Sequence, residues 1–285
     1  MVVELFGDSL ALTLGYGLGQ PLESRYNYVL NGLALLGCGV VDGPIVVVTG
    51  IYDPPPLPCL GKTPDPDAPL TSQPLPVQWE AALVANHPNV VVLLAGRWET
   101  INRVYENKWT NILNPAFAAY VKQQLELVSN LVTATGAHMV FLTEPCNHEN
   151  LQPDGAPWPE QDPARRNTYN RLLAQVAAEH PATDSIVDLN ALVCPGGRFI
   201  WKYKGVTIRK TDGIHFTPEA GQVLGPVILP KILAAGRAEM REAAKLQAET
   251  TPDTTTRRPG SDTREAGPTK LRPPPRPGPE PGRSS

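Results

Sequence analysis

A serine near the start of the chain stands where a nucleophile gains favourable surroundings. Residues 2–6 are an apolar run long enough for one strand, and Gly7-Asp8-Ser9 ends it before a stretch with helical character. The backbone N–H groups at the start of a helix can stabilise an oxyanion beside such a serine. Asp and Ser are also common helix N-caps, so this motif alone indicates no more than a cap.

A second motif, far along the chain, supplies what the serine lacks. Asp212 precedes His215 by three residues, ahead of a helix predicted to have Thr217 as its N-cap and Pro218 as its first residue. A serine hydroxyl needs a base to accept its proton, and the base needs a partner that fixes its tautomer. Ser9, His215 and Asp212 are therefore predicted to form a catalytic triad; the alternative for His215 is a structural histidine at a helix entry.

At these residues the chain resembles the GDSL or SGNH hydrolase superfamily. That superfamily has a first block Gly-Asp-Ser, a second block with a glycine, a third block Gly-x-Asn-Asp and a last block Asp-x-x-His. Residues 7–9 match the first block, and residues 212–215 match the last. The second block falls in residues 36–39, where Gly37 or Gly39 would lend a backbone N–H to the oxyanion.

The third block departs from the superfamily. After the apolar strand of residues 90–95 the chain reads Gly-Arg-Trp-Glu, with Trp98 where the superfamily has Asn. This variant looks like the SGNH domain attached to membrane acyltransferases of the acyltransferase-3 type, which O-acylate cell-envelope carbohydrates; the resemblance covers about residues 1–235. An indole N–H can donate a hydrogen bond, so Trp98 is a predicted oxyanion donor. The alternatives are that Arg97 takes over, that this donor is absent, or that Trp98 packs as a lid.

The resemblance implies serine-dependent acyl transfer or ester hydrolysis, with O-acyl groups on cell-envelope carbohydrate as the expected target. The Ser9 N–H would be a further oxyanion donor, and Asp8, Arg97 and Glu99 are predicted to contact the substrate. No cofactor and no metal are expected. The expected partners are an acyl donor, a carbohydrate acceptor and a membrane acyltransferase. The alternative function is a non-catalytic carbohydrate-binding or accessory module that kept the fold.

Composition limits the other classes of function. The 285 residues carry a formal net charge of −3 at pH 7, which indicates no nucleic-acid surface. No apolar run reaches the length that spans a bilayer. No secretion signal is seen before the first strand.

Four cysteines allow three pairings, and none has the Cys-x-x-Cys spacing of a zinc or redox site. We expect Cys38–Cys59 and Cys146–Cys194, because each pair flanks one loop region at the expected edge of the sheet. Disulfides indicate an oxidising compartment, so an extracytoplasmic location in the cell envelope is expected. Four free thiols in a cytoplasmic protein are the alternative.

The elements between the motifs must bring them to one edge of the fold. Strands are predicted at residues 2–6, 28–36, 89–95, 137–143 and 185–189, and the longer helices at 77–86, 115–135, 163–180 and 217–246. Alternating strands and helices predict a parallel sheet covered on both faces. We expect a three-layer α/β/α sandwich with five strands in a flavodoxin-like order, in which ligands bind at the carboxyl ends of the strands.

The remaining segments are predicted to surround this frame. Residues 52–76, rich in Pro and Asp, form a long loop that is either a rim of the acceptor site or a surface excursion. Residues 201–210 are predicted to form a small hairpin with aromatic and basic side chains. Arg165, Arg166 and Arg171 are expected on the solvated face of their helix. Residues 1–246 are predicted to be the SGNH hydrolase-like domain, and residues 247–285 a disordered tail rich in Pro, Thr and Arg.

Overall fold

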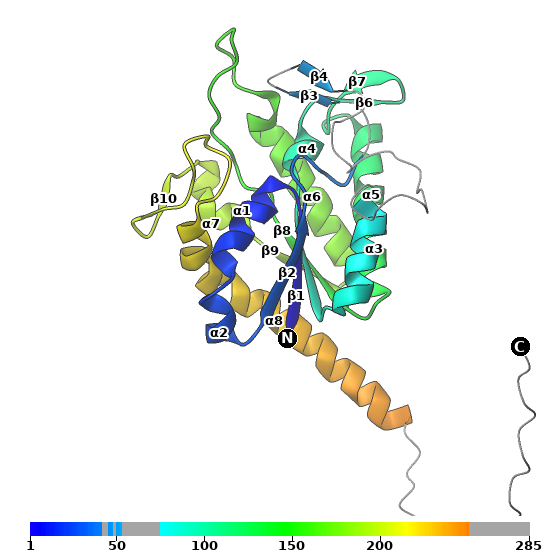
Figure 1. The fold of residues 1–285 in the computed structure, drawn as a ribbon. Coiled ribbons are helices and arrows are strands. Elements are labelled where there is room, and N and C mark those ends of the chain that lie inside the picture. The colour runs from blue at the N-terminus through cyan, green and yellow to red at the C-terminus, as the bar shows by residue number, and fades with distance from the viewer. Residues whose placement is uncertain (42–44, 48–49, 53–74, 251–285) are drawn as a thin grey trace, which may run out of the picture.

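The computed structural model describes residues 1–41, 45–47, 50–52 and 75–250. A five-stranded parallel sheet runs through its centre in the order β2-β1-β5-β8-β9 (Figure 1). The strands are β1 (Val2–Gly7), β2 (Val29–Ala34), β5 (Val90–Leu94), β8 (His138–Leu142) and β9 (Asp184–Val187). The predicted flavodoxin-like order is confirmed, and it places the strand before Ser9 between β2 and β5.

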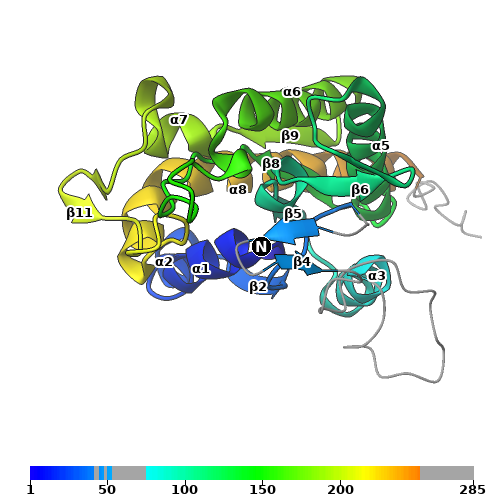
Figure 2. The same cartoon turned by 90° about the horizontal axis from the view of Figure 1, so that it is seen from above.

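Helices cover both faces of this sheet. Successive strand residues point to opposite faces, so Leu5 belongs to one core and Phe6 to the other. The first core is closed by α1 (Ser9–Leu18), α7 (Leu189–Val193) and α8 (Pro218–Thr250), and the second by α3 (Leu75–Asn86), α5 (Pro115–Thr133) and α6 (Pro163–Glu179). Figure 2 shows α1 and α3 on opposite sides of the sheet. The predicted three-layer sandwich is confirmed.

A second, four-stranded sheet lies beyond the upper end of the main sheet in Figure 1. Its order is β4-β3-β6-β7, formed by β3 (Ile45–Val47), β4 (Gly50–Tyr52), β6 (Arg103–Tyr105) and β7 (Lys108–Thr110). The pairing of Ile45 with Arg103 joins its two hairpins. The sequence did not predict this sheet, because three-residue strands are too short to show an apolar period.

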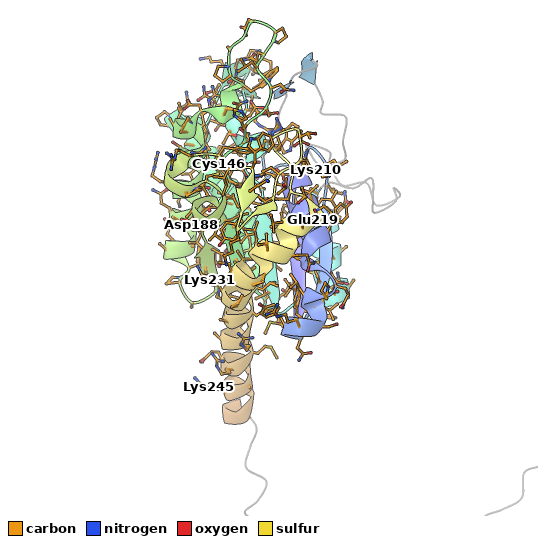
Figure 3. The ribbon with its side chains drawn as sticks, turned by 90° about the vertical axis from the view of Figure 1, so that its left-hand side faces the viewer. Cys146, Asp188, Lys210, Glu219, Lys231 and Lys245 are labelled. Atoms are coloured by element: carbon orange, nitrogen blue, oxygen red, sulfur yellow. A yellow bond between two sulfur atoms is a disulfide. The ribbon has the colours of Figure 1, made fainter. Side chains whose placement is uncertain are left out.

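α8 extends four residues beyond the predicted end at residue 246. The remaining elements of the described residues are short. They are α2 (Leu22–Tyr26), α4 (Arg97–Thr100), two 3-10 helices at Pro159–Gln161 and Pro195–Gly197, and the strands β10 (Lys202–Tyr203) and β11 (Val206–Thr207), which form the predicted hairpin. The final turns of α8 project from the body of the fold, and Lys245 lies on this projecting part (Figure 3). Among the helices that the structure describes, none is both long and apolar enough to cross a membrane.

Two arginines of α6 are used inside the protein, contrary to the prediction of a solvated face. Arg166 is buried, and the negative charge of Glu144 favours its charged form against the effect of burial. Arg165 donates to the Thr100 carbonyl at 2.9 Å. The prediction was wrong because helical spacing does not show which acceptors other elements bring to the helix. Most of the predicted loop at 52–76, and residues 251–285, lie outside the described residues.

Candidate active site

The turn after β1 places Ser9 at the carboxyl edge of the sheet. Gly7 ends β1 with φ of +141°, and a Cβ on it would lie 1.9 Å from the Leu94 carbonyl oxygen. Only glycine fits this turn, because it lacks a Cβ and tolerates positive φ. The Asp8 side chain caps α1 by accepting the Leu10 N–H at 2.7 Å. Ser9 is therefore the first residue of α1, and it lies at the predicted turn between strand and helix.

Asp212 and His215 meet in the turn before α8. His215 Nδ1 lies 2.8 Å from Asp212 Oδ2, while Asp212 Oδ1 accepts the N–H groups of Ile214 and His215. Partial burial would raise the pKa of Asp212, but the hydrogen bonds from His215 and the two amides outweigh it and lower that pKa. An ionised carboxylate at Nδ1 holds a proton there and leaves Nε2 available as a base.

A hydroxyl bridges the helix of Ser9 and the turn of His215. Thr13 Oγ1 donates to the Ser9 carbonyl at 2.8 Å and accepts the Phe216 N–H at 3.3 Å. Within the described ranges, no hydrogen bond joins the Ser9 hydroxyl to His215 itself. Such bonds are often long without substrate and tighten when it binds.

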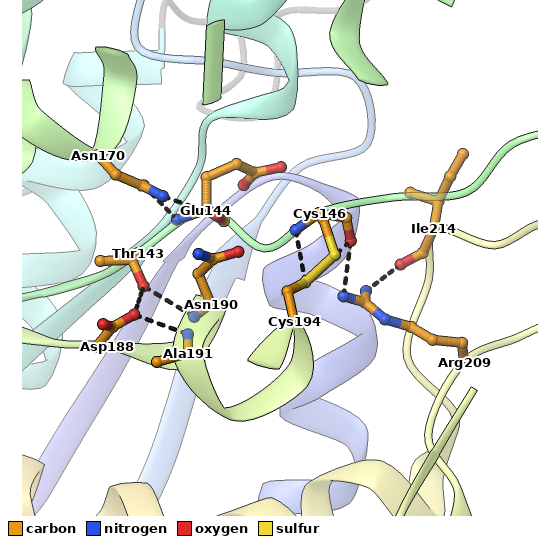
Figure 4. The surroundings of a disulfide bond; sticks show 10 residues. All are labelled: Thr143, Glu144, Cys146, Asn170, Asp188, Asn190, Ala191, Cys194, Arg209 and Ile214. Atoms are coloured by element: carbon orange, nitrogen blue, oxygen red, sulfur yellow. Dashed lines mark hydrogen bonds between the residues drawn. A yellow bond between two sulfur atoms is a disulfide. The ribbon is translucent and has the colours of Figure 1, made fainter. Parts of the chain in front are cut away.

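The buried side chain of Arg209 supports the turn that holds Asp212 and His215. Arg209 donates to the carbonyl of Ile214 at 2.5 Å and to that of Cys146 at 3.1 Å (Figure 4). Its guanidinium carbon lies 4.2 Å from the centre of the Phe216 ring. Burial lowers the pKa of Arg209 to about 10, so the side chain remains a cation at neutral pH. The sequence did not reveal this role, because Arg209 lies in a segment predicted only as a small hairpin with aromatic and basic side chains.

The predicted disulfide between Cys146 and Cys194 is present (Figure 4). Cys146 follows β8 and Cys194 follows α7, so the bond joins the segments that leave β8 and β9. It also fixes the carbonyl to which Arg209 donates. The other predicted pair, Cys38–Cys59, includes Cys59, which lies outside the described residues.

The loop of residues 35–41 carries the glycines predicted as oxyanion donors. The Leu35 N–H donates to the Gly7 carbonyl at 2.9 Å, so the loop begins beside the end of β1. Gly37 has a positive φ of 74°. The structure thus brings this loop to the same edge of the sheet as Ser9.

Gly39, in that loop, lies against α4. A Cβ on Gly39 would lie 1.9 Å from Glu99 Oε1 and 3.0 Å from Trp98 Cβ. Trp98 Nε1 is buried and has no hydrogen-bond partner among the described residues. The two segments predicted to supply oxyanion donors are therefore in contact, and the indole N–H is not used elsewhere in the described fold.

The three residues predicted to contact substrate are enclosed by other protein groups. Asp8 and Glu99 are almost completely buried. Arg97 forms ion pairs with Glu149 and, at 3.0 Å, with Glu160. These positions favour support of the site over direct contact with substrate. The sequence places these residues at the carboxyl ends of strands, but it does not show that other parts of the chain enclose them.

Three carboxyl groups come together behind Ser9. Asp8, Glu99 and Glu144 each have one buried carboxyl oxygen with no hydrogen-bond partner in the described part of the chain. Burial raises the pKa of Asp8 to about 7, and burial with the charges of Asp8 and Glu99 raises that of Glu144 well above its ordinary value. The Tyr169 hydroxyl is a fourth buried group without a partner in those residues, and burial and the three carboxyls raise its pKa. Glu144 was not predicted as a site residue, although it directly follows the predicted strand of residues 137–143, much as Asp8 follows β1.

Aromatic side chains lie on one side of the His215 turn. The His148 N–H donates to the Gly213 carbonyl at 2.9 Å. The centre of the His148 ring lies 5.4 Å from that of Phe199 and 6.1 Å from that of Trp201. Trp201, at the start of the hairpin, is 43% exposed. An aromatic surface is therefore open to solvent close to the turn that holds Asp212 and His215.

Comparison with known proteins gives one family and several similar folds. The model of the SGNH domain (fused to AT3 domains) matches residues 2–230. The solved structure of TesA is similar with a TM-score of 0.50 and 16% identity, over 82% of this chain and 99% of that one. The acetyl xylan esterase AlAXEase is similar with a TM-score of 0.51 and 14% identity, over 81% and 100%. No curated protein sequence matches. At these identities the solved structures show the fold alone.

Proposed function

Because the chain belongs to the family of SGNH domains fused to AT3 domains, we propose that it is a serine-dependent enzyme of acyl-ester hydrolysis or transfer. The observation that carries this proposal is the contact of 2.8 Å between His215 Nδ1 and Asp212 Oδ2. The turn that holds this pair is hydrogen-bonded, through Thr13, to the helix that Ser9 begins. Nucleophile, base and acid thus belong to two elements in direct contact.

In the first half-reaction the Ser9 oxygen attacks the acyl carbonyl while His215 Nε2 accepts the hydroxyl proton. The N–H groups of Ser9 and of Gly37 or Gly39, with the Trp98 indole, stabilise the oxyanion. One such donor is typically worth about 3 kcal/mol. The imidazolium then gives its proton to the departing alcohol, and an acyl ester remains on Ser9.

The second half-reaction frees Ser9. His215, held by Asp212, takes a proton from an acceptor hydroxyl as that oxygen attacks the acyl-serine, and the proton passes to the departing Ser9 oxygen. Water as the acceptor makes the enzyme an esterase, and a sugar hydroxyl makes it an O-acyltransferase. Both side chains of the acid–base pair are partly exposed, so either acceptor has access to the base.

An O-acylated carbohydrate of the cell envelope is the proposed substrate class. The family is described by its fusion to AT3 domains, and one protein of similar fold is an acetyl xylan esterase. The exposed Trp201 beside the His215 turn offers an apolar ring to a sugar. A membrane acyltransferase is the proposed partner, and the Cys146–Cys194 disulfide favours an extracytoplasmic location.

Hydrolysis of p-nitrophenyl acetate by the purified protein tests the serine mechanism. We expect turnover that falls to background in Ser9→Ala, while the melting temperature changes little. Ser24→Ala is the matched control, because Ser24 lies in α2 and its hydroxyl bonds the exposed Gln20 side chain. The same assay with an acetylated xylo-oligosaccharide, with and without an acceptor sugar, distinguishes hydrolysis from transfer.

Two outcomes would contradict the proposal. Turnover that persists in Ser9→Ala would exclude this serine as the nucleophile. A wild-type protein that neither hydrolyses the ester nor reacts with a fluorophosphonate would favour the alternative, a non-catalytic carbohydrate-binding or accessory module. The specific observation for that alternative is Trp98 at the position of the superfamily asparagine.

A further inference from the structure

Glu99 in α4 connects the two segments that carry the proposed oxyanion donors other than Ser9. It is fully buried, and its Oε1 accepts the Val40 N–H at 2.6 Å. The N–H groups of Val41 and of Glu99 itself also favour the charged form of this carboxyl group. One carboxyl group therefore binds the loop of residues 35–41 to the segment of Trp98.

Arg103 closes the same junction from the side of β6. Also fully buried, it donates from Nη1 to the Val41 carbonyl at 2.9 Å and from Nη2 to the Trp98 carbonyl at 2.8 Å. Burial raises the pKa of Glu99, and the charge of Arg103 opposes this rise. The loop of residues 35–41 thus donates N–H groups to the carboxyl group of Glu99. Arg103 donates to one carbonyl of this loop and to the carbonyl of Trp98.

The loop fits closely against Glu99 at Gly39. A Cβ on Gly39 would lie 1.9 Å from Glu99 Oε1 and 2.8 Å from the carboxyl carbon. The backbone of a predicted oxyanion donor is therefore in direct contact with the carboxyl group. Any shift of that carboxyl group changes where this stretch of the loop can lie.

We propose that Glu99 is a positioning residue, whose carboxyl group holds the loop of residues 35–41 against Trp98 and so aims the loop N–H at the oxyanion. The inference rests on the proposed function, because an oxyanion forms only if Ser9 attacks an ester. An oxyanion donor acts only when it lies about 3 Å from the developing charge. Misplacing it by about 1 Å raises the barrier of the reaction and leaves substrate binding nearly unchanged.

The test compares Glu99→Met with Glu99→Gln. Methionine keeps much of the volume and removes the acceptor, whereas glutamine keeps an oxygen for the Val40 N–H. We expect Glu99→Met to lower kcat for p-nitrophenyl acetate roughly 10- to 100-fold at nearly unchanged KM, since a misplaced donor loses part of its contribution. Glu99→Gln should retain most of kcat. The matched control is Glu4→Met: Glu4 is a buried glutamate bonded to Asn86 by a 2.8 Å hydrogen bond, and its loss should change the melting temperature but not kcat.

Hydrogen exchange at the Val40 amide gives a second measurement that does not depend on turnover. This amide should exchange slowly in the wild type, Glu99→Gln and Glu4→Met, and quickly in Glu99→Met. Slow exchange in Glu99→Met, or an unchanged kcat in that folded variant, would overturn the inference. If Glu99→Met does not fold, Gly39→Ala replaces it, because its methyl group must displace the carboxyl group; wild-type kcat there would overturn the inference too. The proposed function fails by a different result, namely no turnover that depends on Ser9 in the wild type.

Discussion

Trp98 stands at the position where the resemblance to the superfamily predicts an asparagine. Its indole N–H is buried without a partner in the described residues, and a buried donor left unpaired costs free energy. A transition-state oxyanion would supply the missing acceptor. We therefore expect Trp98→Phe to lower kcat/KM for p-nitrophenyl acetate by about 10²-fold, measured at a temperature at which both proteins are folded.

Trp109→Phe is the matched control for this prediction. It makes the same change in β7, where the side chain is 48% exposed, and it should leave turnover at the wild-type rate. Equal turnover in Trp98→Phe and the wild type would remove the donor role. Trp98 would then be a packing residue, whose ring centre lies 5.6 Å from the guanidinium carbon of Arg97.

Contacts between candidate site residues were predictable from the sequence where the residues are close in the chain. Asp212 and His215 are three residues apart, so a single turn brings them together, and the structure has them in contact. Asp8 and Glu99 were expected to meet substrate, yet other segments bury them. Arg209 was missed because one of its carbonyl partners, Cys146, is 63 residues away in the chain and is brought to it only by the tertiary fold. Which polar residue ends up buried depends on contacts that one sequence does not reveal.

At the scale of elements, the close packing of α1 against α8 sets the position of Ser9 relative to His215. A Cβ on Gly17 would lie 2.1 Å from the Pro218 carbonyl oxygen and 2.6 Å from the Gly221 Cα. We expect Gly17→Ala to push the helices apart and to lower the free energy of unfolding by about 1–3 kcal/mol. Turnover should fall as well, because Ser9 begins α1 and His215 lies just before α8. Thermal unfolding and initial rates measure the two effects.

Gly19→Ala is the control for Gly17→Ala. It distinguishes the effect of forcing α1 and α8 apart from the general effect of an alanine near the end of α1. A Cβ on Gly19 would meet nothing within 4 Å, so this variant should keep both the rate and most of the stability of the wild type. A Gly17→Ala protein with wild-type turnover would show that the catalytic residues tolerate movement of these helices.

The elements were predictable in proportion to their length and continuity. The five-residue apolar run of β5 is buried at every position, as a central parallel strand requires, and sequence reasoning found it. The sheet of β3, β4, β6 and β7 was missed, because one of its pairings joins Ile45 to Arg103 across β5 and α3. Arg103 was therefore not predicted as a site residue, although it donates to two carbonyl groups beside the candidate site.

At the scale of the whole molecule, the order of the strands brings three acidic side chains together at one edge of the sheet. β1, β5 and β8 are neighbours, and Asp8, Glu99 and Glu144 follow their carboxyl ends. The net charge of −3 gives no hint of this cluster, because it depends on which strands are adjacent. Once the order is known, the cluster follows from the sequence.

The cluster makes the stability of the fold depend on pH. Burial raises the pKa of Asp8 from 3.8 to about 7, so the folded protein binds a proton that the unfolded chain has already released. We therefore expect the contribution of Asp8 to the free energy of unfolding to fall as pH rises from about 4 to about 7, and this loss is complete above that range. A difference of one unit between the folded and unfolded pKa corresponds to about 1.4 kcal/mol. Asp8 therefore contributes at most roughly 4 kcal/mol to the fall in the free energy of unfolding.

Asp8→Asn should flatten this dependence. Asparagine keeps the oxygen that accepts the Leu10 N–H but cannot ionise, and its amide can donate to a neighbouring carboxyl group. The variant should melt within a few degrees of the wild type at pH 4.5 and above it at pH 8, as followed by circular dichroism across the range. Asp162→Asn is the control, because it makes the same change at an N-cap outside the cluster, where the side chain accepts the Ala164 N–H. It measures how much this change lowers the melting temperature when no acidic cluster is involved. If Asp8→Asn and the wild type lose stability in parallel from pH 4.5 to 8, Asp8 is not the group whose proton the folded state retains. The fall then belongs to other buried carboxyl groups with a raised pKa, among them Glu99, Glu144 and Glu149.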